Sequence, residues 1–126
     1  MQIDNDCIRN ILFTIEEHST YSSACCMREA LQKYPKLETY DVEKINYHLR
    51  YLEMKGLIFK PEPNFIFDYD LTPSGHEFIS NIRDNNNWNK IKGISSSIGF
   101  ASLKVVSAIA EGVATAAINQ QLGFSE

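Results

Sequence analysis

The sequence has few of the features that mark secreted, membrane-spanning or metal-binding proteins. Its cysteines, Cys7, Cys25 and Cys26, are odd in number and never spaced as C-x-x-C. They therefore predict free, buried or half-buried thiols in a reducing cytosol rather than a disulfide framework or a metal site. The acidic N-terminus does not resemble a signal peptide, and no apolar run is long enough to span a membrane. We expect a soluble, cytoplasmic protein without metal or cofactor.

Positive charge is also scarce. The 126 residues carry 12 lysines and arginines against 16 aspartates and glutamates, which gives a net charge of −4 and an isoelectric point near 5.4. A nucleic-acid-binding domain of this size is usually basic, or has a concentrated basic stripe. The charge therefore argues against unspecific attraction to nucleic acid, whereas the hydrophobic content of 44% is ordinary for a globular protein.

Catalytic motifs are missing too. The sequence contains no phosphate-binding glycine loop and no nucleophile elbow. His48 and His76 fall on expected helices beside apolar residues, without a serine, cysteine or aspartate at a suitable spacing. We interpret both as hydrogen-bonded, half-buried histidines and expect no enzymatic activity.

Hydrophobic periodicity predicts two helices in the first third of the chain. Asp4 is the expected N-cap of a first helix whose apolar residues recur at helical spacing up to Ile15, and residues 18–23 are typical of a turn. A second helix is expected over residues 23–34, before Pro35. Its inner face would consist of Ala24, Met27, Ala30 and Leu31.

The clearest pattern covers residues 41–58, DVEKINYHLRYLEMKGLI. Thr39 is the expected N-cap of this third helix, and Gly56 is expected to end it in the left-handed conformation. Steps of three and four residues define one core stripe. Its members are Val42, Ile45, Leu49 and Leu52.

Beyond Gly56 the apolar period shortens to two residues. Residues 57–60 and 65–71 predict two strands joined by a turn at PEPN, residues 61–64. The expected inner face of the second strand is Phe65, Phe67, Tyr69 and Leu71, with Ile66, Asp68 and Asp70 on the outer face.

Further helices are expected in the remaining third. Thr72 and Pro73 are typical of the N-cap and first residue of a fourth helix with Phe78, Ile79 and Ile82 as its apolar positions. Residues 85–87 favour a turn, and Trp88 is the expected anchor of a short helix over residues 88–94. The last helix is expected from about residue 100 to 122.

This order predicts a mainly α protein with a small β-hairpin, the α+β class. It matches a winged helix-turn-helix domain over residues 1–84, followed by a C-terminal helical extension over residues 85–126 that packs or dimerises. The third helix would be the recognition helix, and the hairpin would be the wing.

The segments YHLRYLEMKGLI (residues 47–58) and LTPSGHEFISNIRD (residues 71–84), followed by Trp88, resemble a known family. It is an uncharacterised winged-helix family of phages and bacteria, the domain-of-unknown-function family two-five-one-three, close to the YjcQ-like proteins. The resemblance covers roughly the first three-quarters of the chain, and it implies the fold but no established activity. The L-T-x-x-G-x-x-F step is also similar to bacterial winged-helix transcription regulators. A phage or mobile-element origin would agree with this resemblance.

One functional hypothesis is a DNA-binding or regulatory protein. In the third helix Arg50 could bind guanine, while Lys44 and Lys55 could hold phosphates. Against this, the charges of residues 41–55 sum to zero, and the hairpin is acidic. The expected nucleic-acid contacts are Lys44, Tyr47, Arg50, Lys55 and Lys60.

The alternative hypothesis is a protein-interaction adaptor that binds no nucleic acid. Tyrosine, arginine and methionine are enriched at interfaces, so Tyr47, Tyr51 and Met54 suit a protein partner, unless the tyrosines merely pack within the chain. The last helix carries two apolar rows, of which one could dock on its own chain and the other on a second subunit. An intramolecular cap and a membrane-surface helix remain alternatives. The expected interface residues are Tyr51, Met54, Val105, Val106, Ile109 and Val113.

Overall fold

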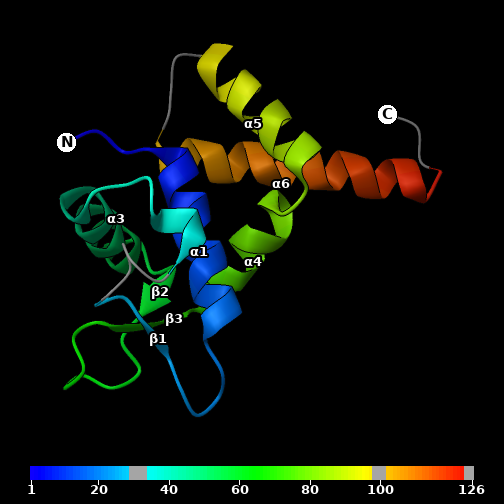
Figure 1. The fold of residues 1–126 in the computed structure, drawn as a ribbon. Helices are drawn as coiled ribbons and strands as arrows, with labels where there is room; N and C mark the ends of the chain where they lie inside the picture. Colours follow the sequence, from blue (N-terminus) through cyan, green and yellow to red (C-terminus); the bar gives the residue numbers. More distant parts are fainter. Residues whose placement is uncertain (29–33, 98–101, 124–126) are drawn as a thin grey trace. The chain divides into compact units, whose positions relative to one another are not determined.

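The computed structural model describes residues 1–28, 34–97 and 102–123 (Figure 1). These residues are mainly helical with a small antiparallel sheet, so the predicted α+β class is confirmed at this level. The chain divides into two compact units, Met1–Ile79 and Ser80–Glu126. The elements are α1 (Asn5–His18), β1 (Cys25–Cys26), the 3-10 helix η1 (Pro35–Leu37), α3 (Val42–Met54), β2 (Ile58–Phe59), β3 (Asp68–Leu71), α4 (Pro73–Ile82), α5 (Asn85–Ser97) and α6 (Leu103–Gln121).

Helix α1 is the central helix of the first unit and packs against both α3 and β3 (Figure 1). Its N-cap is Asp4, as predicted, because the Asp4 carboxylate accepts the backbone N–H groups of Asp6 and Cys7. After α1 the chain turns, also as predicted, and Thr20 pairs with Ser23 in an isolated bridge. The buried face of α1 contains Cys7, Ile8, Ile11, Leu12, Thr14 and Ile15.

The second predicted helix is wrong for its described residues. Cys25 and Cys26 form strand β1, in register with Tyr69 and Asp68 of β3. The pairing continues past the strand, since the N–H of Met27 donates to the Phe67 carbonyl at 2.8 Å. These backbone groups are satisfied by a partner far along the chain, which outweighs the local helical pattern. The rest of that prediction, including Ala30 and Leu31, lies outside the described residues.

Helix α3 has the predicted core stripe in Ile45, Leu49 and Leu52, which are all buried. Its start differs from the prediction. The N-cap is Asp41 rather than Thr39, because the Asp41 carboxylate accepts the N–H of Lys44 at 2.8 Å. Val42 is not a core residue but is 47% exposed. It follows the cap directly, outside the stripe, and the fully buried fourth position is His48 instead.

The sheet has the strand order β1-β3-β2, with β3 in the centre. Tyr69 and Leu71 point inward and are buried, as predicted. Phe65 is not on that face, since it is 59% exposed and lies before the strand. The reason is a local turn: the N–H of Phe65 donates to the Glu62 carbonyl, and the N–H of Asp68 donates to the Phe65 carbonyl. The loop between β2 and β3 is therefore longer than PEPN.

Hydrogen bonds at the start of α4 join the end of the hairpin to the end of α3. Thr72 is the predicted N-cap, and its hydroxyl accepts the N–H of Gly75 at 3.0 Å and donates to the Gly56 carbonyl at 2.5 Å. Gly56 has the predicted left-handed conformation, with φ of 76°. The N–H of Thr72 donates to the Leu57 carbonyl at 3.0 Å. The predicted apolar positions Phe78, Ile79 and Ile82 are buried.

In the second unit α5 begins at Asn85, so the turn predicted for residues 85–87 is wrong. Asp84 explains the difference, because its carboxylate accepts the N–H of Asn87 at 2.9 Å and starts the helix there. Trp88 is buried, as expected of an anchor. Helix α6 starts at Leu103 after an N-cap at Ser102. The expected start near residue 100 lies outside the described residues.

The approach of Gly75 to the chain after α3 leaves no room for a side chain. A Cβ atom at residue 75 would overlap the backbone carbonyl of Leu57, whereas a Cβ at Gly93 in α5 would meet nothing within 4 Å. We expect Gly75→Ala to lower the free energy of unfolding by about 2 kcal/mol or more, because backbone must move. The matched control Gly93→Ala should raise it by up to about 1 kcal/mol through helix propensity. Urea unfolding measures both, and a Gly75→Ala protein of unchanged stability would contradict this packing.

Candidate nucleic-acid interface

The outer face of α3 presents two cations stacked on tyrosines. The Arg50 guanidinium carbon lies 5.1 Å from the centre of the Tyr47 ring, and the Lys55 ammonium lies 5.7 Å from the centre of the Tyr51 ring. Arg50 and Lys55 are exposed, while the two tyrosines are half-buried. Each pair is three or four residues apart, which brings both members to the same side of the helix. Attraction to the ring restrains the Arg50 side chain, and a guanidinium over an aromatic ring still has N–H groups that can donate to a ligand.

Lys44 and Lys60, two other predicted contacts, are held by carboxylates. The Lys44 ammonium lies 2.7 Å from the Asp4 carboxylate, and the Lys60 ammonium lies 2.7 Å from that of Glu53. These hydrogen bonds raise the pKa of each lysine above its ordinary value. Because each charge already has a counter-charge, both lysines attract phosphate less than Arg50 and Lys55 do.

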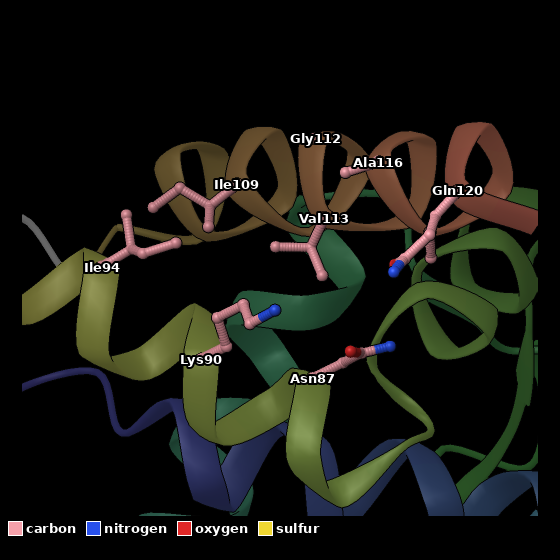
Figure 2. Close-up of a pocket in the computed structure, with 9 residues that line it drawn as sticks. Asn87, Lys90, Ile94, Ile109, Gly112, Val113, Ala116 and Gln120 are labelled. Carbon is pink, nitrogen blue, oxygen red and sulfur yellow. The ribbon is translucent and has the colours of Figure 1, made fainter. Parts of the chain in front are cut away.

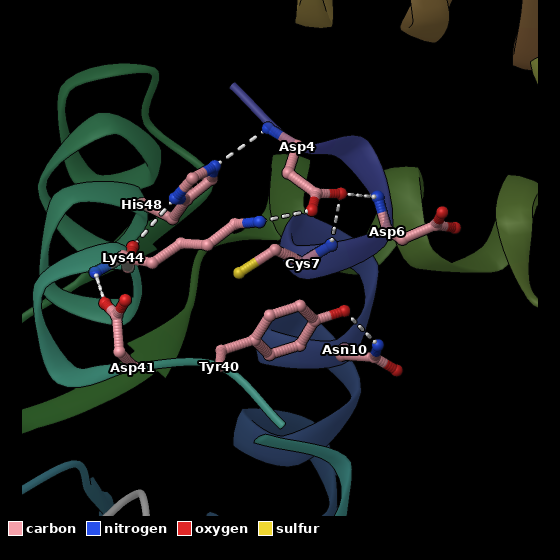
Figure 3. Close-up of polar contacts among 8 residues, drawn as sticks. All are labelled: Asp4, Asp6, Cys7, Asn10, Tyr40, Asp41, Lys44 and His48. Carbon is pink, nitrogen blue, oxygen red and sulfur yellow. Dashed lines mark hydrogen bonds and ion pairs between the residues drawn. The ribbon is translucent and has the colours of Figure 1, made fainter. Parts of the chain in front are cut away.

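His48 joins the beginning of α1 to α3 (Figure 3). The backbone N–H of Asp4 donates to His48 Nε2 at 2.9 Å, and Nδ1 lies 2.8 Å from the Lys44 carbonyl oxygen. Nε2 accepts the Asp4 N–H, and the Lys44 carbonyl oxygen can only accept. Nδ1 is therefore the ring nitrogen that donates. His48 is fully buried. The hydrogen bonding predicted for His48 is confirmed, although this residue is buried more deeply than expected, whereas His76, expected to be half-buried, is exposed.

Tyr40 completes this contact between the two helices. Its hydroxyl accepts the side-chain N–H of Asn10 in α1 at 3.0 Å, and the Lys44 ammonium lies 5.3 Å from the centre of its ring (Figure 3). These contacts together hold α1 against the first turns of α3. The residues that make them are Asp4, Asn10, Tyr40, Lys44 and His48. This arrangement fixes the direction in which the outer face of α3 points.

The described cysteines are free thiols. Burial raises the pKa of Cys7 to about 12 and that of Cys25 to about 11, so both stay protonated and unreactive at neutral pH. Cys26 is exposed, contrary to the expectation of buried or half-buried thiols, because alternate residues of β1 point to opposite faces. Among the described residues no group of three or more histidine, cysteine, aspartate or glutamate side chains is arranged to hold a metal ion.

The second unit contains a groove of about 500 Å³ between α5 and α6 (Figure 2). Two predicted interface residues, Ile109 and Val113, line it. Val105 is half-buried outside this lining, and Val106 is buried. The part that α5 plays in this groove could not be predicted, because it depends on how α5 packs against α6. The α5 residues in the groove are Asn87, Lys90 and Ile94, and small α6 residues such as Gly112 and Ala116 form the opposite wall.

Tyr51 and Met54, the remaining predicted interface residues, belong to α3 in the first unit. Met54 is 81% exposed at the last residue of the helix. No helix in the described part of the chain has the length and apolar character needed to cross a membrane.

These features define a small α+β protein in which the exposed face of α3 bears a cation over a tyrosine ring. The chain belongs to the family DUF2513, described as "Hypothetical protein", whose pattern matches residues 2–101. The expected membership in this domain-of-unknown-function family is thereby confirmed. Comparison with curated proteins and with solved structures gave no match.

The pKa of Asp4 gives a test of the contact between α1 and α3. Burial raises this pKa, but the hydrogen bond from Lys44 and those from the Cys7 and Asp6 N–H groups outweigh burial, so the pKa of Asp4 is lowered from the ordinary aspartate value of 3.8. The stabilisation by the carboxylate is thus present above pH 3.8 and is lost as the pH falls further. We expect Asp4→Asn to lower the unfolding free energy at neutral pH, and its difference from wild type to shrink below pH 3.8.

Urea unfolding across this pH range measures the effect. In a Lys44→Ala background, the same Asp4→Asn change should cost less, since the strongest partner of the carboxylate is gone. A difference between wild type and Asp4→Asn that does not change with pH would contradict the role given to the carboxylate.

Proposed function

We propose that this protein is a winged-helix regulatory protein that binds double-stranded DNA through the outer face of α3. The observation that carries the proposal is Arg50, exposed and stacked on Tyr47 in the middle of that face. A planar guanidinium held in this way suits bidentate hydrogen bonding to guanine in the major groove, and Lys55, the C-cap residue directly after α3, suits a phosphate. The proposed role is non-enzymatic.

The order of the elements supports a winged helix. A helix that packs on α1 is followed directly by a β-hairpin, and α3 contacts β2. The third strand, β1, comes from the segment after α1 and pairs with β3. In such an architecture α3 enters the major groove and the loop between β2 and β3 is the wing.

Charge limits the strength of this binding. Asp41 and Glu43 are exposed at the leading end of α3, Glu62 is exposed in the loop, and Lys44 and Lys60 are paired with carboxylates. Phosphate contacts supply much of the affinity of DNA-binding proteins, so one subunit would bind weakly. Two linked subunits would bind much better through a raised effective concentration.

Arg50→Ala tests the DNA-binding face. We expect the wild-type protein to bind random duplex DNA at low salt, with an affinity that falls steeply as salt rises. Arg50→Ala should weaken binding, and Lys55→Ala, which removes a phosphate contact, should in addition lower the slope of log affinity against log salt by about one. Lys36→Ala is the matched control, because Lys36 is paired with Glu17 at 2.6 Å outside α3, and should leave the slope unchanged. Fluorescence anisotropy measures all three variants, and no binding of wild type at low salt would contradict the proposal.

We also propose that the protein forms a homo-oligomer through the groove between α5 and α6. Ile109 and Val113 in this groove belong to a helix whose second half, after Ala110, contains no buried residue in its described part. Small apolar residues on that half, such as Ala116, allow close packing of a second helix. Two copies of the groove would cover each other in an isologous contact.

Val113→Lys tests this contact. A second ammonium in the same groove as Lys90 would have to be buried beside a like charge, so we expect the variant to be monomeric in sedimentation velocity experiments where the wild type is dimeric. Thr115→Lys is the control, since Thr115 is exposed on α6 and does not line the groove. A monomeric wild type at high micromolar concentration would rule out the proposed oligomer.

A protein-interaction adaptor is the second candidate function. The specific observation in its favour is Met54, which is 81% exposed beside the half-buried Tyr51. Exposed methionine is adaptable and suits varied protein surfaces. If the wild type shows no DNA binding at low salt, this candidate replaces the first.

A further inference from the structure

The hairpin pocket is a small concavity in the first unit, built from two segments far apart in the sequence. The turn after α1 supplies Tyr21 and Ser22, and the segment from the β2–β3 loop through β3 supplies Glu62, Phe65, Asp68 and Asp70. Its volume is about 280 Å³. This is below the range of about 300–1,000 Å³ typical of cofactor and drug sites, and it suits part of a ligand such as one long side chain.

Three carboxylates line this pocket. Asp68 and Asp70 alternate with the buried Tyr69 on β3, so both point to the outer face of the sheet, and Glu62 approaches from the loop. Asp70 also accepts the N–H of Leu71 at 2.7 Å, which orients its carboxylate. The pocket therefore carries several negative charges, which attract a cation.

The cations of the neighbouring residues Lys60 and Arg28 contact groups that do not line the pocket. The Lys60 ammonium is bound to Glu53 and lies 5.1 Å from the centre of the Tyr69 ring. The Arg28 guanidinium lies 4.9 Å from the centre of the Phe67 ring. Neither residue is among those described as lining the pocket. The pocket is therefore negative, and its charge complements a cation from outside.

Exposed aromatic side chains accompany the carboxylates. Tyr21 is fully exposed, Phe65 is 59% exposed, and both line the pocket. Ile66, next to Phe65, is 60% exposed. Apolar side chains left in water on a loop mark a surface that a partner covers. Aromatic rings also attract the guanidinium and ammonium groups that carboxylates bind.

We propose that the hairpin pocket binds an arginine or lysine side chain of a protein partner, whose apolar neighbours cover Phe65 and Ile66. The carboxylates repel nucleic acid, which excludes DNA as the occupant. They are not arranged as a metal site either, since the described residues contain no such group. This surface is separate from Arg50, so the inference goes beyond DNA binding by α3. On this proposal the wing, the loop between β2 and β3, binds a protein rather than a phosphate.

A short synthetic peptide with one arginine between leucines is the probe. Its twin carries citrulline, which keeps the shape of arginine but not its charge. In NMR titrations of the full chain, we expect the arginine peptide to shift the amide signals of residues 20–24 and 61–70 in a saturable manner. The citrulline peptide should bind roughly tenfold more weakly, as expected for loss of a charge-assisted contact.

Variants locate the binding. Glu62→Gln combined with Asp68→Asn should weaken binding of the arginine peptide roughly tenfold. The matched control, Glu38→Gln with Glu77→Gln, removes two exposed carboxylates of the same unit outside the pocket and should leave the affinity unchanged. Phe65→Ala should weaken binding of both peptides, because it removes the shared apolar contact.

Three results would overturn the proposal: equal affinity for the two peptides, equal weakening by pocket and control variants, or shifts that map to α3. Arg50→Ala separates this proposal from the proposed function. It should leave peptide binding unchanged while it weakens DNA binding, so either activity can fail without the other.

Discussion

The contact between Asp4 and α3 is the constraint on which the first unit depends. One carboxylate caps α1 through the N–H groups of Asp6 and Cys7 and also binds the Lys44 ammonium, while the N–H of the same residue donates to His48. The start of one helix thereby sets the position of the other. This contact fixes the orientation of α3 and with it that of Arg50, so a residue outside the proposed DNA surface determines the geometry of that surface.

Features that depend on neighbouring residues could be predicted from the sequence. Asp4, Thr72 and Gly56 were assigned correctly, because a cap or a left-handed glycine is specified within a few residues. Strand β1 could not be predicted in this way. Its hydrogen bonds come from β3, more than forty residues later, and nothing local to Cys25 reports that partner. The asparagines before Trp88 were misassigned because Asp84 supplies the cap that converts them into the first turn of α5.

The candidate sites were predictable to a smaller extent. Periodicity placed Arg50 on the outer face of α3, and the structure agrees. It could not show that Lys44 and Lys60 are bound to Asp4 and Glu53, because those pairs depend on how helices and strands pack. Neither pocket could be predicted from the sequence, for a related reason. Each is lined by two segments that meet only in the folded chain.

The two halves of α6 differ in what holds them in place. Leu103, Val106 and Ala110 are buried in the first half, whereas the described residues from Glu111 to Gln121 include none that is buried. A helical segment that lacks buried side chains is held chiefly by its own backbone hydrogen bonds, and opens at little cost in free energy. Amide hydrogens in the second half should therefore exchange with solvent deuterium well before those of the first. Local unfolding of this protein would start at that end of the helix unless another chain covers it.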